Sequence, residues 1–374
     1  MKKHNIFNII FLFFIASIIT FFSISYVFIP EKVFSEEENR LLQTSPIFTL
    51  EKLLNGTYTH QLHNYFADQI NFRTKMIKIK ACTELFMGKK ENNGLLLGLN
   101  DYIIDTHPYT EENYDLLSKN LNKIEILMQN LSENGIKVNS LIIPRKIDVL
   151  QNYLPKYYSN ERNNEVWKFV NSNHILLTDV LIETQNNGTE VFYKTDHHWT
   201  NDGAYAAYNE ICELLDILPY PLEHFNIESL SSEFLGTSYS KSGFFFSSTE
   251  TIYAPSIEIG KYKVTIVDTD TELDTLYDLS YLNKKDKYSV FLSGNNAHVK
   301  IYDTENQNKE TLLMIKDSFS HSLAPYLCEH FNIELIDPRY FSGSIYKYVE
   351  ENNIKNVLFL FGIDTLAISN LIIK

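Results

Sequence analysis

Two short segments, far apart in the chain, combine residue types that support acyl transfer. One is Thr-Asp-His-His-Trp-Thr at residues 195–200, and the other is Lys-Asp-Ser-Phe-Ser at residues 316–320. A serine hydroxyl is a weak nucleophile at neutral pH, so it needs an imidazole to take its proton and a third group to fix the imidazole tautomer. Because Asp196 and His198 are two positions apart, extended backbone brings their side chains to one face. Together with Ser318 they predict an acyl-transfer site.

Each of these residues also has a simpler interpretation. Ser318 follows an apolar run and precedes a helical pattern, where a serine commonly accepts a backbone N–H as an N-cap. A helix start also offers free backbone N–H groups and a favourable dipole, which are the ingredients of an oxyanion hole. Asp196, His197 and His198 are ligand types that zinc accepts, but no other histidine has the spacing of a zinc motif. We therefore expect a serine site without metal or cofactor.

Further candidates for the site lie in loops or beside the first segment. Seven residues are candidates for binding substrate or for donating to an oxyanion: Tyr340, Arg339, Arg145, Lys146, Trp199, Gly236 and Asn295. The charged residues are equally explained as solvated loop or turn positions, and Trp199 either packs in the core or forms a platform for a sugar ring. The sequence alone leaves these alternatives open.

The sequence on both sides of these segments alternates apolar runs with helical patterns. Strands are expected at 138–144, 175–177, 311–315, 332–336 and 357–361, and helices at 110–134, 163–171, 200–214, 318–329 and 345–351. Such alternation is typical of a parallel sheet with right-handed crossovers, whose ligands bind beyond the carboxyl ends of the strands. Ser318 is expected at that edge, and Asp196 and His198 in the loop before a helix that Thr200 caps.

The rest of the chain divides into three further parts. Residues 234–302 alternate apolar and polar positions, which predicts a β-rich insertion within a catalytic domain of residues 106–374. Residues 31–105 are expected to form a membrane-proximal arm. Residues 1–30 contain an apolar run and are expected to form a transmembrane anchor.

The apolar N-terminal run predicts where the protein resides. Residues 6–29 contain no charged side chain, and a helix of this length crosses roughly 30 Å of hydrocarbon. Lys2 and Lys3 precede the run, so the positive-inside rule places the N-terminus in the cytoplasm. The end of the run is a poor cleavage site, which favours an uncleaved anchor over a removed signal peptide. We therefore expect a single-pass protein of the cell membrane, with its catalytic domain outside.

Charge and cysteine content exclude two other classes of protein. The formal net charge is −14 at pH 7, so we expect no nucleic-acid partner, because such a partner needs a clustered basic surface. The three cysteines, Cys82, Cys212 and Cys328, are too few and too far apart for a disulfide framework.

The first segment resembles the signature of a known family. The string Asp-His-His-Trp-Thr at 196–200, followed by Gly203-Ala204 and Tyr208, resembles the DHHW family, which is similar to the periplasmic alginate O-acetyltransferases. The resemblance extends to Glu38-Asn39-Arg40, Asp68 with Arg73, residues 234–239 and residues 315–319. It implies an α/β fold: an SGNH-hydrolase-like parallel sheet flanked by helices, with the β-rich insertion and the transmembrane helix. The Gly-Asp-Ser-Leu block of ordinary SGNH hydrolases is absent from the sequence.

The resemblance also implies roles and partners. Asp196 would orient the base, His198 would be the base and Ser318 the nucleophile. The activity implied is an extracytoplasmic O-acetyltransferase that forms an acetyl-serine and acetylates hydroxyls of a cell-surface or secreted polysaccharide. A membrane-bound O-acyltransferase is the implied acetyl donor. Two alternatives stay open: a carbohydrate acetyl esterase with the same triad, and a non-catalytic polysaccharide-binding scaffold in which Ser318 only caps a helix.

Overall fold

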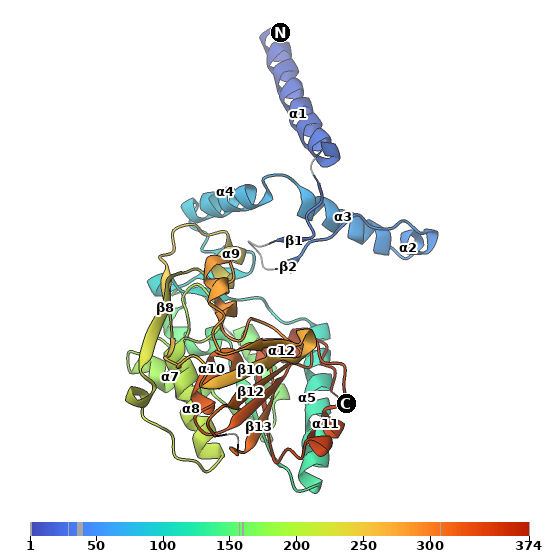
Figure 1. The fold of residues 1–374 in the computed structure, drawn as a ribbon. Helices are drawn as coiled ribbons and strands as arrows, with labels where there is room; N and C mark the ends of the chain where they lie inside the picture. The colour runs from blue at the N-terminus through green and yellow to red at the C-terminus, as the bar shows by residue number, and fades with distance from the viewer. Residues whose placement is uncertain are drawn as a thin grey trace. The chain divides into compact units, whose positions relative to one another are not determined.

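The chain forms two compact units. The computed structural model describes residues 2–28, 30–35, 40–156, 158, 161–306 and 308–373, so Glu38 and Asn39 lie outside the described residues. One unit is Met1–Lys89 with Gly243–Phe245, and the other is Lys90–Ser242 with Phe246–Lys374 (Figure 1). The division into anchor, arm and catalytic domain at residues 30 and 105 remains a prediction.

The first unit begins with one long apolar helix. Helix α1 (Lys2–Phe28) contains the span Ile6–Ile24, whose length and mean hydropathy of 2.4 suffice to cross a membrane. The elements that follow are β1 (Phe34–Ser35), β2 (Arg40–Leu41), α2 (Leu50–Leu54), α3 (Thr57–Gln69) and α4 (Arg73–Phe86). The expected apolar helix is therefore present, while its use as an anchor and its orientation remain predictions.

The second unit is built on an eight-stranded sheet in the order β11-β10-β12-β14-β13-β15-β6-β7. The strands are β6 (Lys137–Ile143), β7 (Ile175–Leu176), β10 (Tyr262–Ile266), β11 (Thr271–Leu273), β12 (His298–Asp303), β13 (Thr311–Lys316), β14 (Asn332–Ile336) and β15 (Asn356–Gly362). Strands β14, β13, β15, β6 and β7 run parallel, as the alternation of strands and helices predicts. Because β13 lies between two parallel neighbours, its carboxyl end delivers Ser318 to the middle of the sheet edge.

Helices cover both faces of this sheet. They are α5 (Glu111–Glu133), α11 (Ile345–Glu351) and α12 (Ile363–Ile368) on one face, and α7 (Thr178–Asn186), α8 (Asn201–Leu214) and α10 (Ser320–Leu327) on the other (Figure 1). Successive strand residues point to opposite faces. On β13, accordingly, Leu312 and Met314 join the core under α8, whereas Leu313 and Ile315 join the core under α5. The unit therefore has three layers.

The predicted insertion differs from expectation in how it joins the fold. Strands β12, β10 and β11 extend the main sheet antiparallel, so the sheet is mixed rather than wholly parallel. Only β8 (Ile227–Phe234) and β9 (Glu250–Pro255) form a separate two-stranded sheet. Alternation of apolar and polar residues predicts strands, but it does not say which sheet edge they extend, because that depends on pairing between distant segments.

Local capping signals fix several helix ends. Thr110 accepts a hydrogen bond from the Asn113 backbone in a capping box, and Thr200 accepts one from the Gly203 backbone at 3.2 Å, so both predicted N-caps are confirmed. Helix α10 starts at Ser320, two residues later than expected. The helix expected at 163–171 is a 3₁₀ helix at Glu161–Phe169.

Shorter elements complete the second unit. They are β3 (Glu91–Asn92), β4 (Leu95–Leu97) and β5 (Ile103–Asp105), which form a three-stranded sheet, and the helices α6 (Lys146–Val149) and α9 (Thr237–Ser242). Short 3₁₀ helices lie at Leu99–Asp101, Gln151–Tyr153, Leu222–Phe225, Val267–Thr269, Leu279–Asn283 and Lys287–Val290.

A buried carboxylate in the sheet makes stability depend on pH. Burial disfavours the charge of Glu334, but hydrogen bonds with His298, Tyr302 and Tyr348 outweigh burial and lower its pKa to about 2. A depressed pKa means that this contribution to stability is full above the ordinary pKa of 4.5 and is lost as the pH falls toward 2. We predict that Glu334→Gln lowers the free energy of unfolding by about 1–3 kcal/mol at pH 7.

The measurement is thermal unfolding of the full chain in detergent at several pH values. The gap in melting temperature between the two proteins should be constant from pH 7 to 5 and should shrink below pH 4.5. A gap that does not change with pH would contradict a charged Glu334.

Candidate active site

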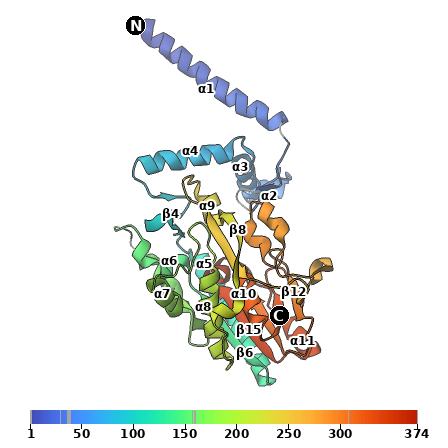
Figure 2. The same cartoon turned by 60° about the vertical axis from the view of Figure 1, so that its left-hand side comes forward.

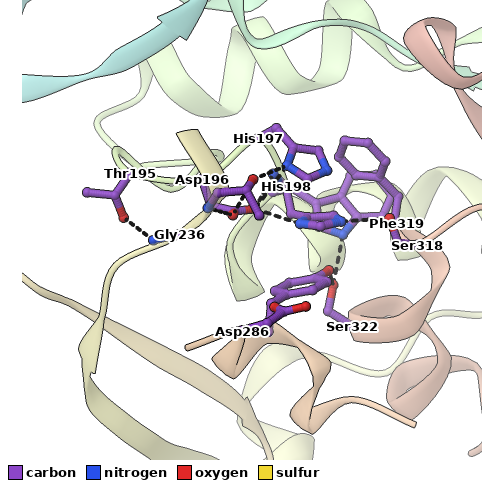
Figure 3. A network of polar contacts seen from close by, with 12 residues as sticks. Thr195, Asp196, His197, His198, Gly236, Asp286, Ser318, Phe319 and Ser322 are labelled. Carbon is purple, nitrogen blue, oxygen red and sulfur yellow. Dashed lines mark hydrogen bonds and ion pairs between the residues drawn. The ribbon is translucent and has the colours of Figure 1, made fainter. Parts of the chain in front are cut away.

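The two chemical segments meet in one chain of hydrogen bonds. Asp196 Oδ1 lies 2.6 Å from His198 Nδ1, and His198 Nε2 lies 2.7 Å from Ser318 Oγ (Figure 3). Asp196 and His198 are buried. In a serine–histidine–acid site, Nδ1 donates to the carboxylate and Nε2 is then free to accept the serine proton. The geometry is therefore that of an activated serine.

The turn after β13 aims the Ser318 hydroxyl. The Asp317 carboxylate accepts backbone hydrogen bonds from Phe319 at 3.1 Å and from Gly362 at 2.8 Å, which ties this turn to the end of β15. The residue before α10 is Phe319, and no side chain caps this helix. The N-cap interpretation of Ser318 therefore does not describe its hydroxyl, which contacts His198 instead.

A narrow loop before α8 holds the acid and the base. Phe192 and Trp199 form an antiparallel bridge, the Tyr193 backbone donates to the His198 carbonyl and the Thr200 backbone donates to the Val191 carbonyl. The backbone N–H of His198 also donates to Asp196 Oδ1 at 3.0 Å. The two-residue spacing of the sequence thus becomes direct contact between carboxylate and imidazole.

Residues from the β-rich region complete the pocket around Asp196. Its Oδ2 accepts hydrogen bonds from the Thr237 backbone at 2.7 Å and from the Thr237 hydroxyl at 3.0 Å. Burial alone would raise the pKa of Asp196, but the neighbouring His197 and His198 hold it well below its usual range. The carboxylate therefore stays charged and can stabilise an imidazolium on His198.

The β8–β9 sheet also holds the loop that contains Asp196 and His198. The Glu250 carboxylate on β9 accepts backbone hydrogen bonds from Lys194 at 2.6 Å and from Thr195 at 2.8 Å. The Gly236 N–H donates to Thr195 Oγ1 at 3.2 Å, so it does not face the nucleophile as the proposed oxyanion donor would. A Cβ on Gly236 would lie 2.3 Å from the Asp196 side chain, so the absence of a side chain at this position lets the backbone approach the Asp196 carboxylate closely.

Aromatic rings pack against the imidazole of His198. The Tyr288 ring stacks on His198 at 3.8 Å with an interplanar angle of 8°, and the Phe319 ring meets it edge-on at 5.1 Å. Trp199 is fully buried, and its Nε1 donates to Ser322 Oγ at 2.9 Å, which also contacts the Tyr288 hydroxyl. Trp199 is thus a core residue that supports the site, and not a platform for a sugar ring.

The adjacent histidine packs against the base. His197 is half-exposed, its ring lies 3.8 Å from that of His198, and its Nδ1 is 2.8 Å from Thr237 Oγ1. Asp196, His197 and His198 place possible ligand atoms within 4.8 Å of one another. Both ring nitrogens of His198 and both oxygens of Asp196 already have protein partners, so the group fits a hydrogen-bonded triad better than a metal centre.

A cavity of about 550 Å³, lined by both polar and apolar groups, opens beside Ser318. Its lining includes three of the predicted residues, Arg145, Lys146 and Arg339. Arg145 pairs with Asp148 at 3.0 Å and lies over the Tyr109 ring, and Arg339 pairs with Asp337 at 2.6 Å. Both guanidinium groups are therefore held in place beside the cavity.

Three of the predicted residues lie elsewhere or have another contact. Lys146 Nζ donates to the carbonyls of Ile103, Lys194 and Asp196, and burial lowers its pKa to about 7. Within the described residues, Tyr340, which is 54% exposed, and the exposed Asn295 do not line the cavity. These three residues are predicted in the site because they follow strand ends or lie in loops. Such a position in the sequence does not determine the direction in which the side chain points.

Several residues in and beneath the cavity carry no recognisable signal in the sequence. Tyr109 donates its hydroxyl to Asp364, and both line the cavity; burial raises the pKa of Asp364 to about 6. Beneath Ser318, Lys316 Nζ lies 2.8 Å from His321 Nε2 and 3.6 Å from the Asp337 carboxylate. Lys316 is within the second segment, but its full burial is a tertiary property that local sequence does not reveal.

The Ser318 backbone supplies one candidate oxyanion donor. Among the described residues, its N–H has no hydrogen-bond acceptor, and it lies just before α10. An unpaired N–H at a helix start, next to the attacking oxygen, is suited to a developing negative charge.

Gly236 provides a test of the packing around the acid. We predict that Gly236→Ala lowers kcat for hydrolysis of an activated acetyl ester by on the order of 100-fold, because the methyl displaces Asp196 from His198. The matched control is Gly343→Ala, for which the three atoms nearest to the added methyl all belong to the ring of Phe341. Equal activity of Gly236→Ala and the unaltered protein, both folded by circular dichroism, would refute this role.

The chain resembles three known proteins in sequence or structure. It is 22% identical to the probable alginate O-acetylase AlgJ of Pseudomonas fluorescens over 173 residues, which are 44% of this chain and 44% of that protein. The crystal structure of a DHHW family protein from Eubacterium siraeum superposes with a TM-score of 0.59 at 21% identity, over 75% of this chain and 94% of that one. Bacillus cereus PatB1 with a sulfonyl adduct gives a TM-score of 0.57 at 21% identity, over 73% and 95%.

These superpositions support the expected SGNH-like α/β fold. The sequence profile described as DHHW protein matches residues 94–336, which include Asp196, His198 and Ser318. This chain belongs to the DHHW protein family.

Proposed function

We propose that this protein is an O-acetyltransferase that acetylates a polysaccharide through an acetyl-serine on Ser318. The observation that carries the proposal is the hydrogen-bonded series Asp196–His198–Ser318, which opens onto a cavity of about 550 Å³. The relative from Pseudomonas fluorescens is named a probable alginate O-acetylase, and PatB1 was solved with a sulfonyl adduct. Both support acyl chemistry at a nucleophile.

The first half-reaction transfers acetyl to the enzyme. His198 Nε2 takes the Ser318 proton while Oγ attacks the acetyl carbonyl of the donor, and the N–H of Ser318 faces the resulting oxyanion. The bond to the leaving oxygen then breaks, and His198 returns its proton to that oxygen. The charge of Asp196 stabilises the imidazolium between these two steps.

The second half-reaction delivers acetyl to the acceptor. A sugar hydroxyl in the cavity gives its proton to His198 Nε2 and its oxygen attacks the acetyl carbon. Ser318 Oγ leaves and regains a proton from His198, so the enzyme returns to its starting state. Fixed donors and acceptors at the lining, such as Arg145, Arg339 and Asp364, suit the hydroxyl-rich surface of a sugar.

Location and partners form part of the same proposal. Helix α1 serves as an uncleaved anchor with the N-terminus in the cytoplasm, which leaves the second unit outside the membrane. An acetyl group reaches that side from a membrane-bound O-acyltransferase, and the acceptor is a cell-surface or secreted polysaccharide.

The triad is tested by acetyl transfer. We predict that Ser318→Ala and His198→Ala each lower turnover by at least on the order of 10²–10⁴-fold, because each removes the activated nucleophile. The full chain in detergent is incubated with an activated acetyl ester and oligosaccharides, and mass spectrometry follows acetyl on protein and sugar. The matched control is Ser256→Ala, an exposed serine on the β8–β9 side of the fold.

The products separate this function from its alternatives. Acetylated sugar that depends on Ser318 supports the transferase, whereas Ser318-dependent acetate without acetylated sugar identifies an esterase. Sugar binding that survives Ser318→Ala, with no acetyl-protein formed, would identify a scaffold.

A second prediction concerns the nucleophile alone. An aryl sulfonyl fluoride should modify Ser318 covalently with loss of fluoride, because the hydroxyl is activated by His198. Peptide mapping should find the adduct on Ser318 in the unaltered protein and no adduct in His198→Ala. Modification that is equally fast in His198→Ala would show that this histidine is not the base.

A further inference from the structure

Helix α4 in the first unit presents an apolar stripe that is exposed. Met76, Ile79 and Phe86 recur at intervals of three and seven residues, so they lie on one side of the helix, and the apolar residue Phe72 directly precedes it as the N-cap. All four are exposed, with Ile79 at 66% and Phe86 at 92%. Ala81, on the opposite side, is fully buried. The helix is therefore amphipathic with its apolar side exposed. A surface helix that only packs against the protein core has its apolar side buried instead.

Basic residues accompany this stripe. Helix α4 contains Arg73, Lys75, Lys78 and Lys80 against the single acid Glu84, in a chain whose formal net charge is −14. Lys75 Nζ lies 5.6 Å from the centre of the Phe72 ring, directly beside the stripe. An apolar stripe with basic flanks is typical of helices that lie in the interface of a membrane containing anionic lipid.

The start of α4 contacts the helix that can span a membrane. The Phe72 ring stacks on the Phe21 ring of α1, with centroids 6.4 Å apart and an interplanar angle of 12°. Phe21 lies within the apolar span Ile6–Ile24. The end of α3 is tied to the same place, since the Tyr26 hydroxyl donates to the Phe66 carbonyl. These contacts place Phe72 level with the last turns of the span.

Helix α4 then leads away from the last turns of α1. Figure 1 shows α4 extending sideways from the end of α1, and Figure 2 shows it running back beneath α1 at an acute angle. If α1 crosses a bilayer, the start of α4 at Phe72 therefore lies close to the bilayer surface.

We propose that α4 is an in-plane membrane-binding helix. Its apolar stripe inserts at the boundary between headgroups and acyl chains on the side where α1 leaves the bilayer, and its lysines contact anionic headgroups. The inference rests on the proposed function only in taking α1 as the membrane anchor. A lipid surface fits better than a second copy of the chain, because two α4 helices packed stripe to stripe would bring their basic flanks together.

A native cysteine allows the inference to be tested. Cys82 lies on α4 and is exposed, whereas Cys212 and Cys328 are buried, so a thiol reagent labels Cys82 in the folded protein. The full chain carrying an environment-sensitive fluorophore at Cys82 is reconstituted in vesicles of phosphatidylcholine with or without phosphatidylglycerol. We expect blue-shifted emission and quenching by lipids brominated near the headgroup, both stronger with phosphatidylglycerol.

Variants identify which side of the helix inserts. Ile79→Glu and Phe86→Glu should each reduce the blue shift and the quenching, because they put a charge on the stripe. The matched control is Ile126→Glu on α5, where a side chain that is 52% exposed belongs to the other unit and the label should be unaffected. Circular dichroism of each variant checks that the helices are intact.

Alkaline extraction separates failure of this inference from failure of the anchor. A protein that resists extraction but whose label emits as in water would overturn the in-plane helix while leaving α1 as an anchor. A protein released by alkali would overturn the anchor and the inference with it. A blue shift of the Cys82 fluorophore that appears in detergent and grows with protein concentration would show that a second copy of the chain covers the apolar stripe. That result would overturn the assignment of a lipid surface.

Discussion

A charged carboxylate buried beside an imidazole is the interaction on which the site depends. Asp196 stays ionised because His197 and His198 outweigh the cost of its burial, and His198 and Thr237 supply hydrogen-bond donors in place of water. Those donors come from two places, the loop before α8 and the start of α9, so the acid is functional only when the β-rich region is folded against the sheet. The packing of the β-rich region against the sheet is therefore coupled to the protonation state of the Asp196 carboxyl group.

The chemistry of the site could be predicted because it depends on residue type and local spacing. Asp196 and His198 were identified as a pair from a spacing of two, and Ser318 from its place after an apolar run; the strand and the turn then bring them together. The sequence also predicts Thr110 and Thr200 as helix N-caps, because capping involves only residues that are neighbours in sequence. Residue spacing and apolar periodicity therefore predict the parallel strands of the sheet and the grouping of Asp196, His198 and Ser318.

Contacts between distant segments could not be predicted in the same way. Tyr288 stacks on His198 and Glu250 holds the catalytic loop, yet both lie in a region whose alternating pattern predicts only strands. Lys146 was expected in the cleft, but its ammonium group turns back to three carbonyls. A pattern of apolar and polar residues predicts which positions are buried, but the partner of a buried polar group is decided by the tertiary fold.

The ammonium group of Lys146 has a consequence for how the protein can be divided. One of its three acceptors is the Ile103 carbonyl in β5, so the small sheet at residues 91–105 closes the back of the catalytic loop. A fragment that starts at residue 106 would remove that acceptor and leave a buried donor without its partner. A fragment that starts at Lys90 keeps the acceptor. The part of the chain that folds around the site therefore includes the small three-stranded sheet at residues 91–105.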